Sequence, residues 1–263
     1  MLIEQSIIKN RLLARLPSEE FARFAPMLTL VKLAMAAPLH RAGEKIDSVY
    51  FVENGFVSVL AVLSDGRPLE VGLIGSEGVV GVSVILGATH AYCETMCQTA
   101  GAAYRSSAAA LKEAVTTSPM LGSLLLRYVH VFNVQVAQTA ACNAHHELSQ
   151  RLARWLLAAH DRSDRAELSL TQDLIAVMLG VRRSTVSIAA SMLQRAGFIR
   201  YQHGRITIVD RAGLEDAACE CYKAGANEYR DMFDDASPAS SAVDQIGRSG
   251  NSDNFGLGWK SRT

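Results

Sequence analysis

The chain has 263 residues, of which 49% are hydrophobic, so it can bury a real core in one large domain or two modest ones. Its 26 basic and 26 acidic residues cancel, but residues 147–211 hold 10 basic against 6 acidic residues. The five cysteines are an odd number without disulfide-scaffold spacing, which excludes a small secreted scaffold and favours the reducing cytosol.

The first 27 residues predict short helices and no export signal, because charges interrupt every apolar run. The longest apolar segment, 120–136, carries Arg127, His130 and Asn133 and is too polar to span a bilayer. We therefore expect a cytoplasmic protein without a membrane partner.

Residues 28–105 have a different sequence pattern, in which short β-type runs are separated by glycine. The runs most typical of strands are 49–52, 56–60 and 69–73. Good turn formers stand at 53–55 and 64–66. This region predicts a compact all-β barrel or roll.

A helix is expected over 108–117, and Ser118-Pro119 then begins a long helix to about Ala144. Apolar residues recur along it at spacings of four and three, as in a coiled coil. The seam consists of Leu125, Val129, Phe132, Val136, Thr139 and Asn143. It could pack on its own β-roll; we favour a dimer seam, whose polar end at Thr139 and Asn143 suits a hinge.

After an amphipathic helix over 147–160, with Arg151 and Arg154 expected to point outward, residues 171–199 predict a helix-turn-helix. Thr171 caps the first helix, and Gly180 permits the left-handed backbone of a tight stop. The second helix has an apolar inner stripe and a polar outer face suited to a major groove. The outer face comprises Arg183, Ser184, Ser187, Ser191 and Gln194.

Two β-type runs, 198–201 and 205–208, flank Gln202-His203-Gly204 and predict a hairpin, which completes a winged helix-turn-helix. The positive excess of the chain coincides with this region, as a phosphate-binding surface requires. A further helix is expected from Asp210 to about Met232. The tail beyond it is too poor in apolar residues to fold.

A β-roll, a long dimer helix and a winged helix-turn-helix in this order resemble the Crp/Fnr superfamily of bacterial transcription regulators, over roughly residues 10–232. The motifs that match are Gly43-Glu44 ahead of Asp47–Gly55, then Ser149–Ala153 and, most specifically, Leu179–Ser187. The resemblance implies an α+β fold with an N-terminal cyclic-nucleotide-binding-like β-roll. It also implies a homodimer on palindromic double-stranded DNA, with RNA polymerase as a partner.

This resemblance divides the chain into a β-roll sensor domain with N-terminal helices (1–117), a dimerisation helix and hinge (118–146) and a DNA-binding domain (147–232). A disordered tail (233–263) follows. In the family, the arginine that matches Arg183 reads guanine, because its fork holds the O6 and N7 acceptors together.

Two positions depart from the family pattern. Ser184 stands where glutamate is common, and Ile188 stands where the cyclic-AMP receptor type has arginine. We therefore expect a half-site other than TGTGA. With the positions that usually touch phosphate included, the predicted DNA-binding residues are Thr171, Arg182, Arg183, Ser184, Thr185, Ser187 and Ser191.

The sensor is predicted not to bind cyclic AMP or cyclic GMP. Nucleotide binders of the family need a Gly-Glu pair for the ribose and an Arg-Ser/Thr-Ala for the phosphate, yet no arginine lies between Arg67 and Arg105. A buried phosphate without a guanidinium partner is costly. Glu77 is interpreted as a turn residue. No cofactor is predicted, and an unidentified small-molecule effector stays open.

No metal site is predicted either. Iron–sulfur sensing needs about four clustered thiolates, and no cysteine precedes Cys93. Cys93 and Cys97 are interpreted as small core residues rather than a redox pair. Cys219 and Cys221 are expected on opposite faces of one helix, and His145-His146 as solvated hinge residues. No residue supports haem.

Two functions therefore compete. The first is a homodimeric, sequence-specific DNA-binding regulator. The alternative is a small-molecule or redox-sensing protein whose helix-turn-helix is only structural. An enzyme is not predicted, because the chain has no nucleophile–base pair, phosphate loop or catalytic metal spacing.

Overall fold

The structure is a computed structural model that describes residues 3–234. The predicted tail at 233–263 lies, apart from its first two residues, outside these described residues. The chain opens with helices α1 (Arg11–Ala14) and α2 (Ser18–Phe24), flanked by single helical turns at Gln5–Ile7 and Ala25–Met27. Buried Asn10 caps α1 and ties it to the β-roll by donating to the carbonyls of Val52 and Gly78.

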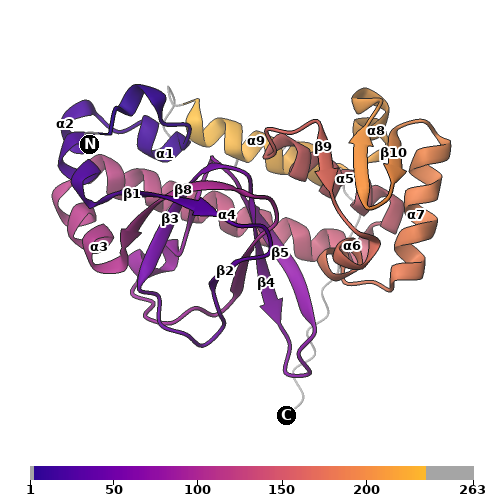
Figure 1. Cartoon of the computed structure of the whole chain (residues 1–263), viewed down its shortest axis with the longest axis horizontal. Coiled ribbons are helices and arrows are strands. Elements are labelled where there is room, and N and C mark those ends of the chain that lie inside the picture. Colours follow the sequence, from indigo (N-terminus) through magenta and orange to yellow (C-terminus); the bar gives the residue numbers. More distant parts are fainter. Residues whose placement is uncertain (1–2, 235–263) are drawn as a thin grey trace, which may run out of the picture. The chain divides into compact units, whose positions relative to one another are not determined.

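The predicted β-roll is confirmed as two four-stranded antiparallel sheets (Figure 1). Its strands are β1 (Thr29–Leu33), β2 (Pro38–His40), β3 (Ser48–Asn54), β4 (Val57–Val62), β5 (Pro68–Ile74), β6 (Val79–Val80), β7 (Glu94–Cys97) and β8 (Gly101–Ser107). The sheets have the orders β1-β8-β3-β6 and β2-β7-β4-β5. A helical turn at Val82–Leu86 follows β6.

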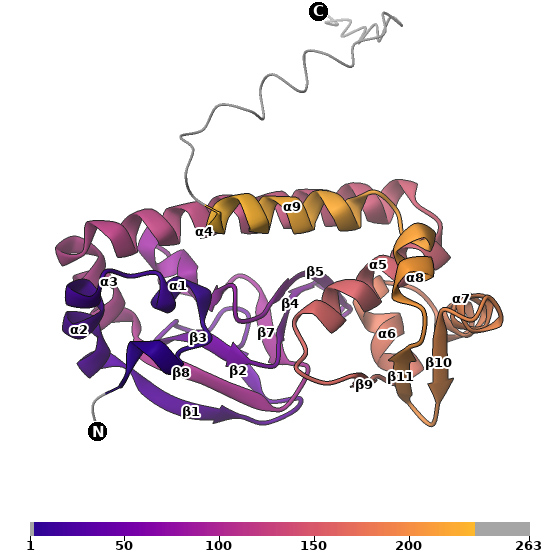
Figure 2. The same cartoon turned by 90° about the horizontal axis from the view of Figure 1, so that it is seen from above.

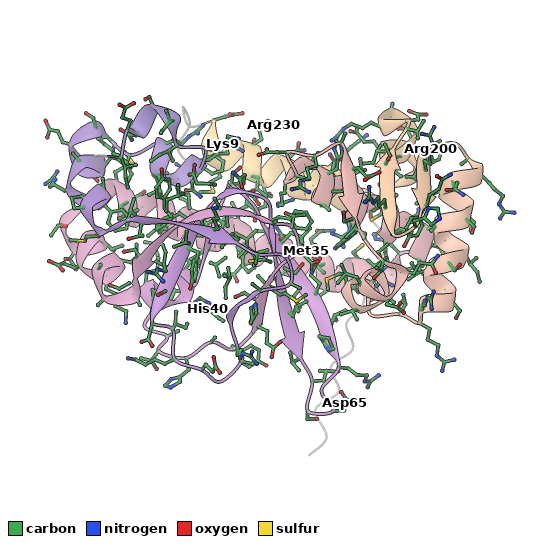
Figure 3. The ribbon with its side chains drawn as sticks, in the orientation of Figure 1. Lys9, Met35, His40, Asp65, Arg200 and Arg230 are labelled. Carbon is green, nitrogen blue, oxygen red and sulfur yellow. The ribbon has the colours of Figure 1, made fainter. Side chains whose placement is uncertain are left out.

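The roll has an apolar core between its two sheets. Val52 and Ala103 from one sheet pack with Val59 and Ile74 from the other. Leu60 and Leu73 belong to a second cluster, which continues into the C-terminal domain. Strands β4 and β5 therefore contribute to two cores and join the two halves of the protein. Their hairpin tip carries Asp65 (Figure 3).

Helices α3 (Ala108–Thr117) and α4 (Pro119–His145) follow at the predicted places. Ser118 separates them, and its hydroxyl caps α4 by accepting from the backbone N–H of Leu121. Among the described residues no single helix is long and apolar enough to cross a bilayer; only the sharply bent pair of helices at 172–179 and 183–195 passes on length and composition.

The predicted dimer seam on α4 is largely occupied by the chain itself. Leu125 is fully buried, Thr139 is 8% exposed, and Phe132 packs against the β-roll core. Packing on its own roll, the alternative role for this seam, therefore holds for Phe132. An exposed stripe lies one residue further along at the same alternating spacing; it comprises Ser123, Leu126, His130, Asn133, Ala137, Ala140 and Ala144.

The C-terminal domain contains α5 (Leu148–Asp161), β9 (Glu167–Ser169), α6 (Gln172–Leu179), α7 (Arg183–Arg195), β10 (Ile199–Gln202), β11 (Arg205–Ile208) and α8 (Arg211–Ala217). Its core is built around Trp155, Leu156 and Ile175. The outward orientation predicted for Arg151 is wrong. This side chain is 8% exposed, and its Nη2 donates to the carbonyl of Leu179 at 2.5 Å.

The single helix predicted from Asp210 to Met232 is also wrong, because the chain breaks it at 218–220 and continues as α9 (Cys221–Phe233). Asp210 does cap α8, by accepting from the backbone N–H of Gly213. Helix α9 lies beside α4 (Figure 2), where its Tyr229 hydroxyl accepts from Gln135. The contacts of α9 along α4 outweigh the local helix propensity, which predicted one continuous helix.

Candidate DNA-binding surface and inner pocket

The helix-turn-helix forms at the predicted residues. Helices α6 and α7 are bent by 104° relative to each other, within the usual range of the motif. Gly180 ends α6 with φ 64° and ψ 37°, the left-handed conformation that its lack of a side chain permits. The Thr171 hydroxyl accepts from the backbone N–H of Leu174 at 3.2 Å and caps α6.

Helix α7 presents the predicted polar face to solvent. Its apolar stripe of Val186, Ala189 and Leu193 is buried, which leaves the opposite face free. Of the seven predicted DNA-binding residues, Ser187 is half-buried; those exposed are Thr171, Arg182, Arg183, Ser184, Thr185 and Ser191. Ile188 is 62% exposed on the same face.

Local contacts orient several of these side chains. Arg183 Nε lies 3.6 Å from Asp173 Oδ1 in an exposed ion pair, which an incoming phosphate or base can displace at little cost. Ser191 donates to the carbonyl of Ser187, one turn earlier. Gln194 is engaged differently from the prediction, because its Oε1 accepts from the backbone N–H of Tyr201. It joins α7 to the wing.

The wing is the predicted hairpin, with β10 and β11 paired antiparallel. Its turn uses positive φ at His203 and Gly204, 51° and 74°. The third strand, β9, pairs with β11 and was not predicted, because three residues carry too weak a pattern. Arg200 on β10 is exposed and adds a positive charge to the wing (Figure 3). The sequence predicted only that this residue lies in a strand.

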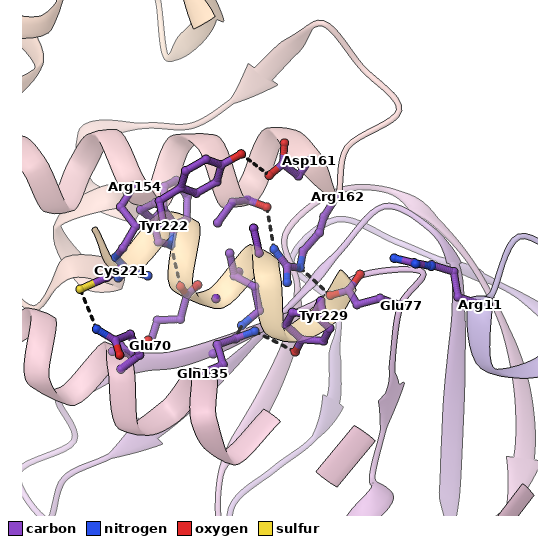
Figure 4. Close-up of a pocket in the computed structure, with 18 residues that line it drawn as sticks. Arg11, Glu70, Glu77, Gln135, Arg154, Asp161, Arg162, Cys221, Tyr222 and Tyr229 are labelled. Carbon is purple, nitrogen blue, oxygen red and sulfur yellow. Dashed lines mark hydrogen bonds and ion pairs between the residues drawn. The ribbon is translucent and has the colours of Figure 1, made fainter. Parts of the chain in front are cut away.

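A pocket of about 230 Å³ lies between the β-roll, α4, α5 and α9 (Figure 4). Glu70 from β5 accepts from Trp155 Nε1 at 2.6 Å and from the Ser58 hydroxyl. Glu77 pairs with Arg162 at 2.6 Å between Oε1 and Nε. Glu77 lies in the turn at 76–77, as predicted, and it is in addition buried and bonded to the far domain.

Comparisons with known proteins match both halves of the chain. Residues 30–118 match the cyclic nucleotide-binding domain, and residues 150–217 match the Crp-like helix-turn-helix domain. The chain belongs to the Crp/Fnr family.

Among the curated relatives is the transcriptional regulator LdrP of Thermus thermophilus, 27% identical over 207 residues, which cover 73% of this chain and 98% of LdrP. The transcriptional regulator SdrP of the same organism is 28% identical over 178 residues, 65% of this chain and 84% of SdrP. The family is one of transcription regulators, and it indicates no catalytic function.

Solved structures agree in fold. FixK2 from Bradyrhizobium japonicum superimposes with a TM-score of 0.63 at 18% identity, over 73% of this chain and 98% of FixK2. A crp/fnr-family regulator from Eubacterium rectale has the same TM-score at 17% identity, over 78% and 96% of the two chains.

The buried Glu70 carboxyl predicts a pH-dependent stability for this Crp/Fnr chain. Burial raises the pKa of Glu70 to about 7, although Ser58 and Trp155 donate to it. The folded state then binds more protons than the unfolded state between pH 4.5 and 7, so stability falls as pH rises through this window, by about 3 kcal/mol. We expect Glu70→Gln to flatten the fall, because its oxygen can accept from Trp155 and its NH₂ group can donate to the Ser58 hydroxyl.

Urea unfolding of the wild type and of Glu70→Gln at pH 5 and pH 8 tests this expectation. Other titrating groups cancel in the comparison of the two proteins. Equal pH dependence in both would show that Glu70 is ionised throughout.

Proposed function

We propose that the chain is a sequence-specific DNA-binding transcription regulator that acts as a homodimer on a palindromic site, with RNA polymerase as a further partner. The observation that carries the proposal is the outer face of α7. Arg182 and Arg183 stand at its N-terminus, where positive charge is unfavourable to the helix dipole and favours a nearby anion. The hydroxyls of Ser184 and Ser187 continue along the same face.

Selection of bound DNA from a random library by the purified full-length chain tests this function. A dimer predicts two inverted half-sites about 10 base pairs apart, or a multiple of that spacing. Failure to enrich any sequence, together with unchanged binding across unrelated duplexes, would contradict it.

The exposed stripe of α4, from Ser123 to Ala144, is the surface we assign to the dimer contact. Its small residues Ala137, Ala140 and Ala144 allow two helices to approach closely, and Leu126 is 56% exposed at the other end. The heptad spacing suits two helices related by a two-fold axis.

We expect Ala137→Glu to disrupt this dimer. At a two-fold axis each new carboxylate faces its own copy, so the dimer dissociation constant should rise by at least about 100-fold, or about 2.7 kcal/mol. Sedimentation equilibrium measures the shift. The control is Ala109→Glu, which places the same charge on an exposed position of α3. Equal dissociation constants in both variants would move the interface elsewhere.

The pocket beside Glu70 is the candidate effector site. At about 230 Å³ it is smaller than the roughly 300–1,000 Å³ of common ligand pockets, which favours an effector smaller than a nucleotide. Within residues 3–234, the Nε of Arg154 at its wall is buried and makes no hydrogen bond, so an anionic group would satisfy it.

Native mass spectrometry of the purified chain should show a retained small ligand and no uptake of cyclic AMP. A ligand-free spectrum from fully DNA-binding protein, or cyclic AMP uptake, would contradict this assignment.

A further inference from the structure

Four soft metal ligands converge where α4 ends and α9 begins. They are Cys142, His146, Cys219 and Cys221, and their ligand atoms all lie within 4.8 Å of one another. The three thiols are buried, at 0%, 4% and 3% exposure. We propose that this cluster is a tetrahedral Cys₃His site for Zn²⁺.

The spacing of the ligand atoms suits a single small ion. Cys142 Sγ lies 3.5 Å from Cys219 Sγ, and Cys221 Sγ lies 3.4 Å from His146 Nδ1. Zinc–sulfur bonds of about 2.3 Å in a tetrahedron place two sulfurs about 3.8 Å apart. These two pairs are therefore within a few tenths of an ångström of the tetrahedral distances, and the other pairs lie within 4.8 Å.

The fold supplies the four groups from two directions. Cys142 is on the last turn of α4, and His146 follows it by four residues, so both side chains share one face. Cys219 lies in the break after α8, and Cys221 is the first residue of α9. The expectation that Cys219 and Cys221 point to opposite faces of a helix is wrong, because Cys219 is not in a helix.

The surroundings are those of a metal site. His146 uses Nδ1 toward the cluster, while its Nε2 lies 3.1 Å from Glu220 Oε1. A carboxylate on the outer nitrogen of a ligating histidine is the usual means of orienting the ring. Gln138 Nε2 also donates to Cys221 Sγ at 2.9 Å, a contact that supports a thiolate.

Charge balance favours thiolates here. Three thiolates and Zn²⁺ carry a net charge of −1, and the guanidinium groups of Arg151 and Arg154 act electrostatically on Cys142. Binding of Zn²⁺ to the thiols releases their protons to solvent.

A disulfide, an iron–sulfur cluster and a purely apolar role each account for fewer of the contacts than zinc does. A Cys142–Cys219 disulfide would not explain the contact between Cys221 and His146, or the pairing of His146 with Glu220. An iron–sulfur cluster holds its thiolates further apart, because several irons and sulfides stand between them. Buried core cysteines do not explain an imidazole aimed at them. A zinc ion would clamp α9 to α4 at the junction with the DNA-binding domain.

The test uses the full-length chain purified without chelator under reducing conditions. Metal analysis should find about one zinc per chain, and X-ray absorption should show three sulfurs at about 2.3 Å and one nitrogen at about 2.0–2.1 Å. Cys219→Ser should lose the zinc, whereas Cys93→Ser, which removes a thiol outside the cluster, should keep it.

Glu220→Gln provides a variant that keeps all four ligands. Its side chain is 77% exposed, so folding should be unaffected, and competition with a zinc-binding dye should show about 10- to 100-fold weaker affinity. This result decides the matter if Cys219→Ser fails to fold. A zinc-free protein that takes up no added Zn²⁺, bound iron, a Cys142–Cys219 disulfide, or unchanged zinc affinity in Glu220→Gln would each overturn the proposal.

Discussion

Arg183→Ala should abolish recognition of the selected DNA site while leaving the fold intact. A bidentate arginine–guanine contact contributes about 1–3 kcal/mol per half-site, so a dimer should lose about 2–6 kcal/mol of specific binding. The free protein should lose little stability, because the 3.6 Å ion pair of Arg183 with Asp173 is exposed to solvent. Fluorescence anisotropy with the selected duplex and a scrambled one measures both losses.

Two variants sharpen this experiment. Arg183→Lys keeps the charge but not the fork, so it should retain binding to scrambled DNA and lose preference for the selected site. Arg195→Ala removes the same charge from the exposed C-terminal end of α7 and should reduce specific binding far less. If Arg183→Ala binds the selected duplex as the wild type does, the helix-turn-helix is structural and the chain is a small-molecule or redox sensor.

The sequence predicted those elements that local signals determine. The caps at Thr171 and Asp210, the glycine at the end of α6 and the apolar period of α7 act within a few residues of each other. The β-roll strands followed from short apolar runs between turns. The exposure of Arg183 then follows from the opposite face of α7 being apolar.

What the sequence did not predict depends on contacts between distant segments. Helix α4 carries two neighbouring series of residues at spacings of four and three, one containing Leu125 and the other Leu126. Only the position of the β-roll decides that Leu125 is covered and Leu126 is not. The break after α8 arises from packing of α9 on α4. It brings Cys219 to Cys142, 77 residues away, a contact that no local pattern indicates.

Glu77→Gln should strongly destabilise the protein, because it leaves a buried cation without its partner. Glu77 and Arg162 are 85 residues apart, and their side chains are only 10% and 12% exposed. Removing one member of a buried ion pair commonly costs about 3–5 kcal/mol. The neutral amide can still accept from the backbone N–H of Gly75. The loss of stability therefore reports the missing charge and not a lost hydrogen bond in the turn. Urea unfolding at pH 7 gives the free-energy difference.

A double-mutant cycle with Arg162→Met separates the pair from its surroundings. The double variant removes both charges and should recover much of the loss in Glu77→Gln, since neither buried charge stays unpaired. Glu167→Gln, in the exposed pair with Arg205, is the control and should cost less than about 1 kcal/mol. Because Glu77 comes from the β-roll and Arg162 from the end of α5, a large coupling energy would also show that this pair holds the two domains together. A Glu77 committed in this way is unavailable to a ribose, so Glu77→Gln should change stability without creating or removing affinity for cyclic AMP.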